Sequence, residues 1–231
     1  MRILLDLLFP RRCPVCDRVQ PIGEIVCSSC RDSLKKVQSP FCNKCGKILA
    51  DEREEYCSDC NAGIHIYTEG RALYEYPCIR KSIYRFKYKG RREYAEFYGK
   101  ELAEHLGLII KSWQPEALIP VPLHSSRKQS RGYNQAELLA KALGKQLGIP
   151  VISHIVKRVK KTVPQKKLSQ VQRQNNLKRA FKIIRNDVKL NTIIIIDDIY
   201  TTGSTIDSMS AVLKEAGIKN IYFIALAIGR G

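Results

Sequence analysis

Eight cysteines arranged in four Cys-x-x-Cys pairs constrain this chain more than any other feature of its sequence. Successive pairs are separated by 10, 11 and 11 residues. The two thiolates of such a pair point at a common centre, and two pairs complete the tetrahedral shell that Zn²⁺ prefers. The spacing therefore predicts two structural zinc ions, held by Cys13, Cys16, Cys27, Cys30, Cys42, Cys45, Cys57 and Cys60.

Two pairings of the four motifs satisfy this spacing. In the sequential pairing, the first two motifs share one zinc and the last two share the other, which gives two zinc ribbons in tandem. We prefer this pairing because the short segment between the two motifs of each ribbon can bring both motifs to the same zinc ion. An interleaved cross-brace, joining motifs one and three and motifs two and four, is also permitted. A disulfide framework is disfavoured because disulfides belong to secreted proteins and no signal peptide is evident.

Composition is that of a soluble globular protein, and we expect the chain to stay in the cytoplasm. It has 231 residues, of which 44% are hydrophobic and 27% charged. The longest uncharged apolar stretch, Ile221–Ile228, is far below the ~20 residues that a membrane-spanning helix needs, so no membrane insertion is expected. The apolar start carries Asp6 and lacks the small-residue cleavage site of a signal peptide.

A domain boundary is expected near residue 66. Residues 1–66 hold all four motifs and few apolar side chains, which predicts a double zinc-ribbon domain held together by metal rather than by a core. In residues 67–231, helical spacing and apolar runs alternate, which is typical of an α/β parallel sheet flanked by helices. Expected strands cover 117–121, 151–156, 192–196 and 221–228, and expected helices cover 94–106, 134–147 and 205–216; residues 79–86 fit a helix, although 84–89 also permit a strand.

Positive charge is concentrated in the second domain. The chain has 40 Lys and Arg against 22 Asp and Glu, a net charge of +18, and residues 1–66 contribute only +1 of it. Two runs carry most of the excess: Arg80–Arg92, with seven basic residues and no acid, and Lys157–Lys189, with twelve basic residues and one acid. Such runs favour phosphate-rich ligands, although one run alone could be a solvated basic face.

The most specific motif lies near the carboxyl end of the chain. Four consecutive isoleucines, Ile193–Ile196, predict a strand buried on both faces, and Asp197 and Asp198 follow at its carboxyl end, where open α/β sheets bind ligands. A turn of threonine, glycine and serine then opens a helix, whose free N–H groups suit a phosphate. Two carboxylates beside a phosphate-binding loop would repel the phosphate unless they bind hydroxyls or Mg²⁺ on the same ligand. A phosphorylated sugar supplies this combination.

This motif resembles the fingerprint of type I phosphoribosyltransferases. The resemblance implies that Asp197 and Asp198 are the catalytic acids, accepting hydrogen bonds from the ribose hydroxyls of phosphoribosyl pyrophosphate, directly or through Mg²⁺. It also implies that the following turn holds the 5-phosphate of that ligand or of ribose 5-phosphate. Ser204 stands where many members have a second glycine. The expected phosphate-binding residues are Thr201, Thr202, Gly203, Ser204 and Thr205.

Two further basic segments match positions that contact pyrophosphate in that fold. Residues 120–135 follow an expected strand and precede an expected helix, as the pyrophosphate loop does, and Arg127 and Arg131 can fork onto phosphate oxygens. The segment after residue 157 lies where the family keeps a flexible lid. Its candidate pyrophosphate-binding residues are Arg158, Lys160 and Lys161, together with Thr162, Gln165, Arg173 and Asn176.

Taken with the paired cysteines, these motifs are similar to the ComF family of competence proteins over nearly the whole chain. The supporting segments include Tyr88-Lys89-Gly90, Pro122-Leu123-His124 and Arg131–Gln135. The resemblance implies a cytoplasmic role in natural transformation, in which single-stranded DNA is moved or handled beside a DNA-translocating helicase partner. Composition and spacing by themselves support two zinc ions, a phosphoribosyl pocket and basic surfaces.

Two functions are compatible with these features. The first is a nucleic-acid-handling module that retains a phosphoribosyl site. Its proposed DNA-binding residues are Lys87, Lys89, Arg91 and Arg92, which interleave with Tyr84, Phe86 and Tyr88 in the basic and aromatic mixture that single strands favour, although these aromatics could equally belong to the core. The second is an active transferase that moves the phosphoribosyl group to a base or amine, with the acid pair stabilising positive charge on the ribose.

Overall fold

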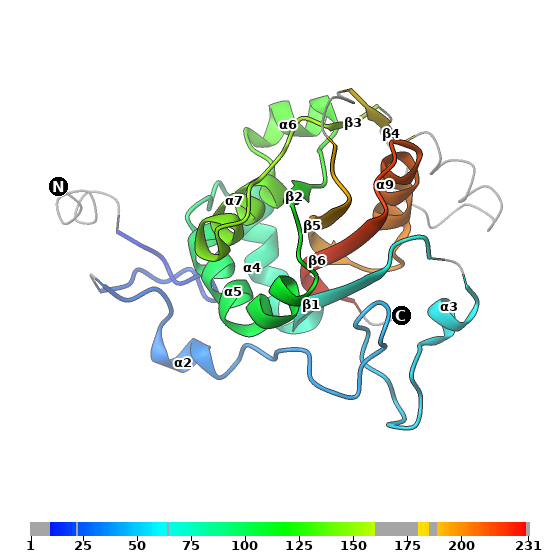
Figure 1. Ribbon diagram of the computed structural model, residues 1–231. Helices are drawn as coiled ribbons and strands as arrows, with labels where there is room; N and C mark the ends of the chain where they lie inside the picture. The colour runs from blue at the N-terminus through cyan, green and yellow to red at the C-terminus, as the bar shows by residue number, and fades with distance from the viewer. Residues whose placement is uncertain (1–9, 22, 64, 160–179, 185–188, 230–231) are drawn as a thin grey trace.

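The centre of the protein is a four-stranded parallel sheet with the strand order β1-β6-β5-β2. The computed structural model describes residues 10–21, 23–63, 65–159, 180–184 and 189–229 (Figure 1). The four strands are β1 (Glu69–Glu75), β2 (Ala117–Pro120), β5 (Thr192–Tyr200) and β6 (Asn220–Ile228). The predicted α/β class, with a parallel sheet flanked by helices and preceded by zinc ribbons, is confirmed.

The two central strands are the most apolar, as a sheet covered on both faces requires. Ile193–Ile196 of β5 are completely buried, and Ile195 stands beside Phe223 of β6 in register. The isoleucines alternate between the two faces, so Ile194 belongs to one core cluster and Ile195 to the other. One strand therefore supplies the centre of both hydrophobic cores.

Helices cover both faces of the sheet (Figure 1). Three helices, α4 (Tyr76–Tyr88), α5 (Tyr94–Ser112) and α7 (Gln135–Leu147), pack on the face of Ile194, and α9 (Ser204–Glu215) packs on the face of Ile195. Asn134 caps α7 by accepting a hydrogen bond from the backbone of Ala136 at 3.2 Å. The alternative of a strand over residues 84–89 is wrong, because α4 continues to Tyr88.

Two expectations for strands are corrected. The predicted strand over 151–156 joins the sheet only through an isolated bridge between Val151 and Leu118, since the exposed Ser153 and His154 then lead the chain away. Val156 instead begins a separate two-stranded antiparallel sheet of β3 (Val156–Arg158) and β4 (Phe181–Ile183). Strand β1 was not expected, because its charged residues interrupt the apolar pattern.

The ribbon segment forms two compact loops with single-turn helices, α2 (Ser28–Arg31) and α3 (Ser58–Asn61). Between the loops, Lys36 bridges Tyr74 in antiparallel register. Two backbone hydrogen bonds flank this bridge, from Val37 N to the Leu73 carbonyl at 2.9 Å and from Glu75 N to the carbonyl of Lys35 at 3.0 Å. The linker between the ribbons therefore runs along the outer side of β1.

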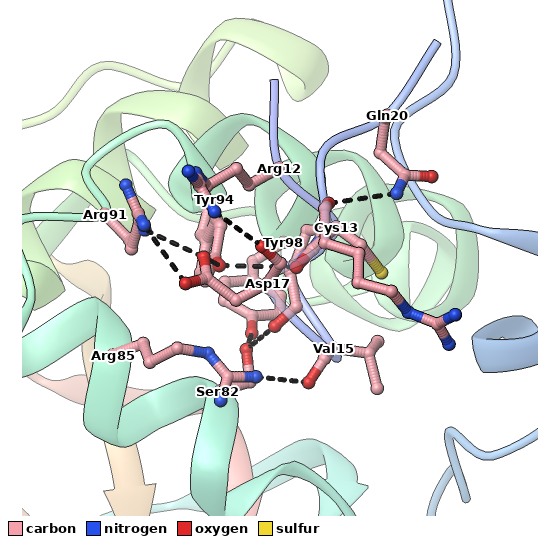
Figure 2. Close-up of polar contacts among 12 residues, drawn as sticks. Arg12, Cys13, Val15, Asp17, Gln20, Ser82, Arg85, Arg91, Tyr94 and Tyr98 are labelled. Carbon is pink, nitrogen blue, oxygen red and sulfur yellow. Dashed lines mark hydrogen bonds and ion pairs between the residues drawn. The ribbon is translucent and has the colours of Figure 1, made fainter. Parts of the chain in front are cut away.

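Asp17 of the first ribbon docks onto the start of α5 and the turn that precedes it (Figure 2). Arg91 donates to both carboxylate oxygens of Asp17, at 2.8 and 3.0 Å, and the Tyr94 hydroxyl donates to Oδ1 at 2.6 Å. Burial raises the pKa of Asp17, but the hydrogen bonds from Arg91 and Tyr94 outweigh it and leave the pKa below its ordinary value. Asp17 is thus a charged anchor between ribbon and helices.

Three carbonyls of the same ribbon turn accept hydrogen bonds from the helices. The Tyr94 hydroxyl shares its proton between Asp17 and, at 3.3 Å, the Cys13 carbonyl, while Ser82 donates to the carbonyl of Pro14 and Arg85 to that of Val15. Figure 2 shows Ser82 and Arg85 reaching this turn from α4. Because α4 contributes two of these donors, the position of α4 depends on the first ribbon.

We expect Asp17→Asn to lower the free energy of unfolding by ~1.5–3 kcal/mol, the contribution of hydrogen bonds to a charged group. Urea denaturation of the zinc-loaded protein measures this change. Asp51→Asn is the matched control, since Asp51 pairs with Arg53, whose side chain is 90% exposed, and such surface pairs contribute little. Equal unfolding midpoints for the two variants would contradict the anchoring role of Asp17.

Candidate functional site

The eight paired cysteines form two separate four-sulfur clusters, and within each cluster the sulfurs lie within 4.8 Å of one another. Tetrahedral coordination with Zn–S bonds of ~2.3 Å places sulfurs about 3.8 Å apart. The Sγ atoms of Cys16 and Cys27 are 3.7 Å apart, and those of Cys45 and Cys57 are 3.6 Å apart, so both clusters fit zinc. The clusters are Cys13, Cys16, Cys27 and Cys30, and Cys42, Cys45, Cys57 and Cys60.

This grouping confirms the sequential pairing and shows that the cross-brace alternative is wrong. A shell of four thiolates has no open position for substrate, so both sites are structural. They support different faces of the sheet. Cys13 and Cys30 pack within the core cluster of Ile194, whereas Cys42, Cys45 and Cys60 pack within that of Ile195.

The acid pair and the threonine turn lie where β5 ends and α9 begins. Strand β5 includes Asp197 and Asp198 and continues to Tyr200, and α9 starts at Ser204. The backbone of Gly203 has a φ of +74°, and a Cβ there would lie 2.7 Å from both His65 Cε1 and the Tyr200 hydroxyl. Any side chain at this position would clash, so only glycine allows the backbone conformation that leads into α9.

Asp197 and Asp198 have different electrostatic surroundings. Burial, and then the negative charge of Asp198, raise the pKa of Asp197 to about 8. The backbone N–H of Asp198 donates to Asp197 Oδ1 at 2.8 Å. The carboxylate of Asp198 forms an ion pair with Lys87, whose side chain is 19% exposed. Lys87, proposed from sequence to bind DNA, therefore belongs to the acid pair.

The two arginines of the expected pyrophosphate loop lie beside Lys87. Residues 125–131 form a short helix, α6 (Ser125–Arg131), rather than an irregular loop. A cavity of about 280 Å³ is lined by Lys87, Tyr88, Gly90, Arg127, Ser130 and Arg131. The structure thus brings together three cations from α4 and α6 next to Asp198, an arrangement suited to a polyanion such as pyrophosphate.

Arg158 belongs to the same electrostatic environment. It lies in β3 with its guanidinium carbon 5.4 Å from the centre of the Phe181 ring. Burial and then the positive charge of Arg127 lower the pKa of Arg158, while Asp197 opposes them. The remaining lid candidates, Lys160, Lys161, Thr162, Gln165, Arg173 and Asn176, fall outside the described residues.

The four residues proposed from sequence to bind DNA do not form one free patch. Lys87 is paired with Asp198 and Arg91 with Asp17. The Arg92 guanidinium lies over the Tyr133 ring at 4.8 Å, and Lys89 is an exposed residue at the end of α4. DNA binding by this set stays a prediction, and the structure leaves Lys89 as the most available of the four.

A buried histidine next to the turn at Gly203 could not be found from sequence. His65 Nδ1 donates to Asp207 Oδ2 at 2.7 Å, and Asp207 Oδ1 accepts from the backbone N–H of Ile66 at 2.9 Å. The His65 ring stacks on Tyr67, whose hydroxyl shares a hydrogen bond of 2.7 Å with the Tyr200 hydroxyl. Because His65 and Asp207 are 142 positions apart, no local pattern could link them.

Models of known families match both parts of the chain. A double zinc ribbon domain matches residues 4–61, and a phosphoribosyl transferase domain matches residues 130–230. Among solved structures, a purine phosphoribosyltransferase from Pyrococcus horikoshii is 23% identical, covering 60% of this chain and 73% of its own, with a TM-score of 0.34. The two family models define the class: a phosphoribosyl transferase domain preceded by a double zinc ribbon.

Curated relatives narrow this class. Competence protein F of Haemophilus influenzae is 33% identical over 87% of this chain and 96% of its own length. Competence protein ComFC of Bacillus subtilis is 29% identical over 84% and 80%, and the DNA utilization protein YhgH of Salmonella typhi is 28% identical over 85% and 87%. The chain belongs to the ComF family of competence proteins. Within its described residues, no helix is long and apolar enough to cross a membrane.

Elemental analysis of the purified chain should give two zinc ions. We expect Cys42→Ser to lose one ion, because three thiolates leave the second shell incomplete. Cys78→Ser is the control and should keep both, since Cys78 lies outside the two clusters and its thiol donates to the carbonyl of Glu75 at 3.0 Å. Wild-type protein with fewer than two zinc ions, or loss of zinc on Cys78→Ser, would contradict the assignment.

We expect His65→Ala to weaken binding of ribose 5-phosphate roughly tenfold, because the turn at Gly203 loses the group that supports it and Asp207 loses a buried hydrogen bond. Calorimetry measures the affinity. His154→Ala is the control, since His154 is exposed. If His65→Ala keeps wild-type affinity, the histidine supports only folding; zinc content and melting temperature measured alongside show whether the variant is folded.

Proposed function

We propose that this chain is a ComF-type protein that binds phosphoribosyl pyrophosphate and handles single-stranded DNA in the cytoplasm during natural transformation. The main support for this proposal is the acid pair near the end of β5. It lies between the phosphate turn, which comprises Thr201–Thr205, and the cationic cavity, which is lined by Lys87, Arg127 and Arg131. The relatives are named competence proteins and DNA utilization proteins, which supports the role in DNA handling.

Phosphoribosyl pyrophosphate has three groups, and each has a counterpart in the site. The turn from Thr201 to Thr205 and the start of α9 offer hydroxyls and backbone N–H groups to the 5-phosphate. Asp197 and Asp198 offer acceptors to the ribose hydroxyls. Lys87, Arg127 and Arg131 offer cations to the pyrophosphate. A phosphate ligand that lacks the ribose or the pyrophosphate would leave at least one of these three parts without a partner.

Lys87 connects the last two parts. Lys87 forms an ion pair with the Asp198 carboxylate. When ribose hydroxyls donate to the acid pair, Lys87 becomes available to the pyrophosphate beside Arg127 and Arg131. The carboxylates are also hard oxygen ligands of the kind that Mg²⁺ prefers. A bound Mg²⁺ would offset the negative charge of the pyrophosphate, and Asp197 and Asp198 are the residues that would hold it.

The same acid pair favours a second function, transfer of the phosphoribosyl group to a base or amine. The bond from C1 of the ribose to the pyrophosphate oxygen breaks, and pyrophosphate leaves with its electron pair. The acceptor nitrogen attacks C1 from the opposite side, with inversion, and loses its proton to water. Asp197 and Asp198 would stabilise positive charge on the ribose, and Lys87 and Arg131 the leaving pyrophosphate. Pyrophosphate release with candidate acceptors distinguishes this function from binding alone.

The cellular setting follows from the family. We infer that the chain acts beside a DNA-translocating helicase, as the ComF resemblance implies. Incoming DNA is single-stranded and polyanionic, and the phosphoribosyltransferase-like domain carries the +17 that attracts it. Anisotropy with a labelled oligonucleotide at near-physiological salt tests this part, and absence of binding by the intact chain would overturn it.

We expect Asp198→Asn to weaken binding of phosphoribosyl pyrophosphate ten- to a hundredfold, because a charged acceptor contributes ~1.5–3 kcal/mol to a hydrogen bond. Calorimetry with Mg²⁺ present measures the affinity. Glu137→Gln is the control, since Glu137 pairs with Lys141 on the surface of α7. If Asp197→Asn/Asp198→Asn binds as wild type does, the assignment of the sugar site is wrong.

A further inference from the structure

A second cavity lies along α4, outside the sugar-phosphate site described above. Its volume is about 420 Å³, and eight of its lining residues come from α4. The ninth is Ile199, which directly follows the acid pair on β5. Lys87 and Tyr88 line both this α4 cavity and the cationic cavity next to α6. The α4 cavity therefore adjoins the sugar-phosphate site and shares one wall with it.

Two tyrosines give the α4 cavity an exposed aromatic surface. Tyr84 and Tyr88 are 54% and 60% exposed, and their ring centres lie 5.1 Å apart on successive turns of α4. The Arg131 guanidinium lies 4.8 Å from the centre of the Tyr88 ring. By contrast, Phe86 of the same helix is completely buried. The aromatic side chains of this segment thus divide between a core and an open stacking surface.

Cations surround these rings. Arg80 and Lys81 are exposed and line the cavity, one turn before Tyr84. Among the residues that the structure describes, neither forms an ion pair with an acid. Lys87 is already neutralised by Asp198, so it does not compete for the same anion. The cavity consequently offers flat rings and uncompensated positive charge at once.

A flat ring beside a phosphate is the chemistry of a nucleotide. Bases of any sequence stack on exposed aromatic side chains, and the neighbouring cations bind the backbone phosphates. The lining combines apolar groups, among them Ile83 and Ile199, with the cations of Arg80, Lys81 and Lys87, so it suits a flat ring that carries a phosphate. The cavity volume of about 420 Å³ also leaves space for one base and its phosphate rather than for a folded domain.

We propose that the α4 cavity binds one nucleotide unit of a single-stranded nucleic acid, with its base on Tyr84 and Tyr88 and its phosphate on Arg80 and Lys81. The proposal rests on the proposed function and deepens it, because it names where the strand contacts the protein. It also replaces the sequence-based set, in which Lys87 and Arg91 are held by intramolecular ion pairs. The strand then lies beside the acid pair.

The test compares variants of the full zinc-loaded chain in anisotropy titrations with a labelled oligothymidine. Tyr84→Ala/Tyr88→Ala should weaken binding roughly tenfold or more, because the stacking surface is lost. Tyr84→Phe/Tyr88→Phe should restore binding, since the ring faces remain. Arg80→Ala/Lys81→Ala should weaken binding and reduce the salt slope by about 0.7, the contribution of the one phosphate contact that is lost. Tyr56→Ala, at a 40% exposed tyrosine of the second ribbon, is the control.

Each outcome decides between the proposals. If the alanine pair at Tyr84 and Tyr88 binds the oligonucleotide as tightly as wild type, the α4 site is wrong while DNA handling stands. If wild-type protein does not bind the oligonucleotide, both fail. If thymidine monophosphate binds as tightly as the oligonucleotide, the site takes free nucleotides, and the assignment to a strand is overturned. Unchanged affinity for ribose 5-phosphate in the alanine variants shows that the sugar site remains intact.

Discussion

The arrangement of this protein depends on placing two adjacent carboxylates at the end of a buried strand. Burial removes Asp197 from water and the charge of Asp198 repels it, which is why the pKa of Asp197 is raised. Such a pair needs nearby cations, and Lys87 supplies one from α4. The position of α4 is in turn fixed by Ser82 and Arg85, which hold the turn of the first ribbon. Through this chain of contacts, a zinc ribbon far from the site in sequence helps to set the charge balance of the acid pair.

The second ribbon reaches the same site from the other face, because His65 follows it directly and supports the turn at Gly203.

The features predicted well from sequence are those whose residues all lie within one short segment or repeat at regular spacing. Four Cys-x-x-Cys motifs with even spacing identify two four-cysteine clusters, and Ile193–Ile196 followed by two acids and a glycine-containing turn identify the central strand and the turn into α9. The features that were missed depend on partners distant in sequence. Strand β1 has charged residues within its apolar pattern and is held by pairing with β6, and the short strand β3 pairs with β4 across a long separation. His65 and Lys87 acquire their roles only when the fold brings Asp207 and Asp198 to them.

The basic run of α4 shows why net charge alone does not locate a binding surface. A helix distributes neighbouring residues around its axis, so cations that are adjacent in sequence face different surroundings. Lys87 turns to the acid pair, Arg85 to the ribbon carbonyl, and Arg80 to the open cavity. Within this one helix, the positive charges thus serve internal pairing with Asp198 and docking of the ribbon, and they also line an open cavity.

The linker between the ribbons occupies the outer side of β1, where Lys36 bridges Tyr74 and Val37 donates to the Leu73 carbonyl. An uncovered edge strand is a template for pairing with another chain, and proteins that expose one tend to aggregate. The zinc ribbons hold both ends of the linker in place. Metal binding in the two ribbons therefore has a consequence for the sheet as well as for the site, because the linker that covers the β1 edge is anchored at both ends by a four-cysteine cluster.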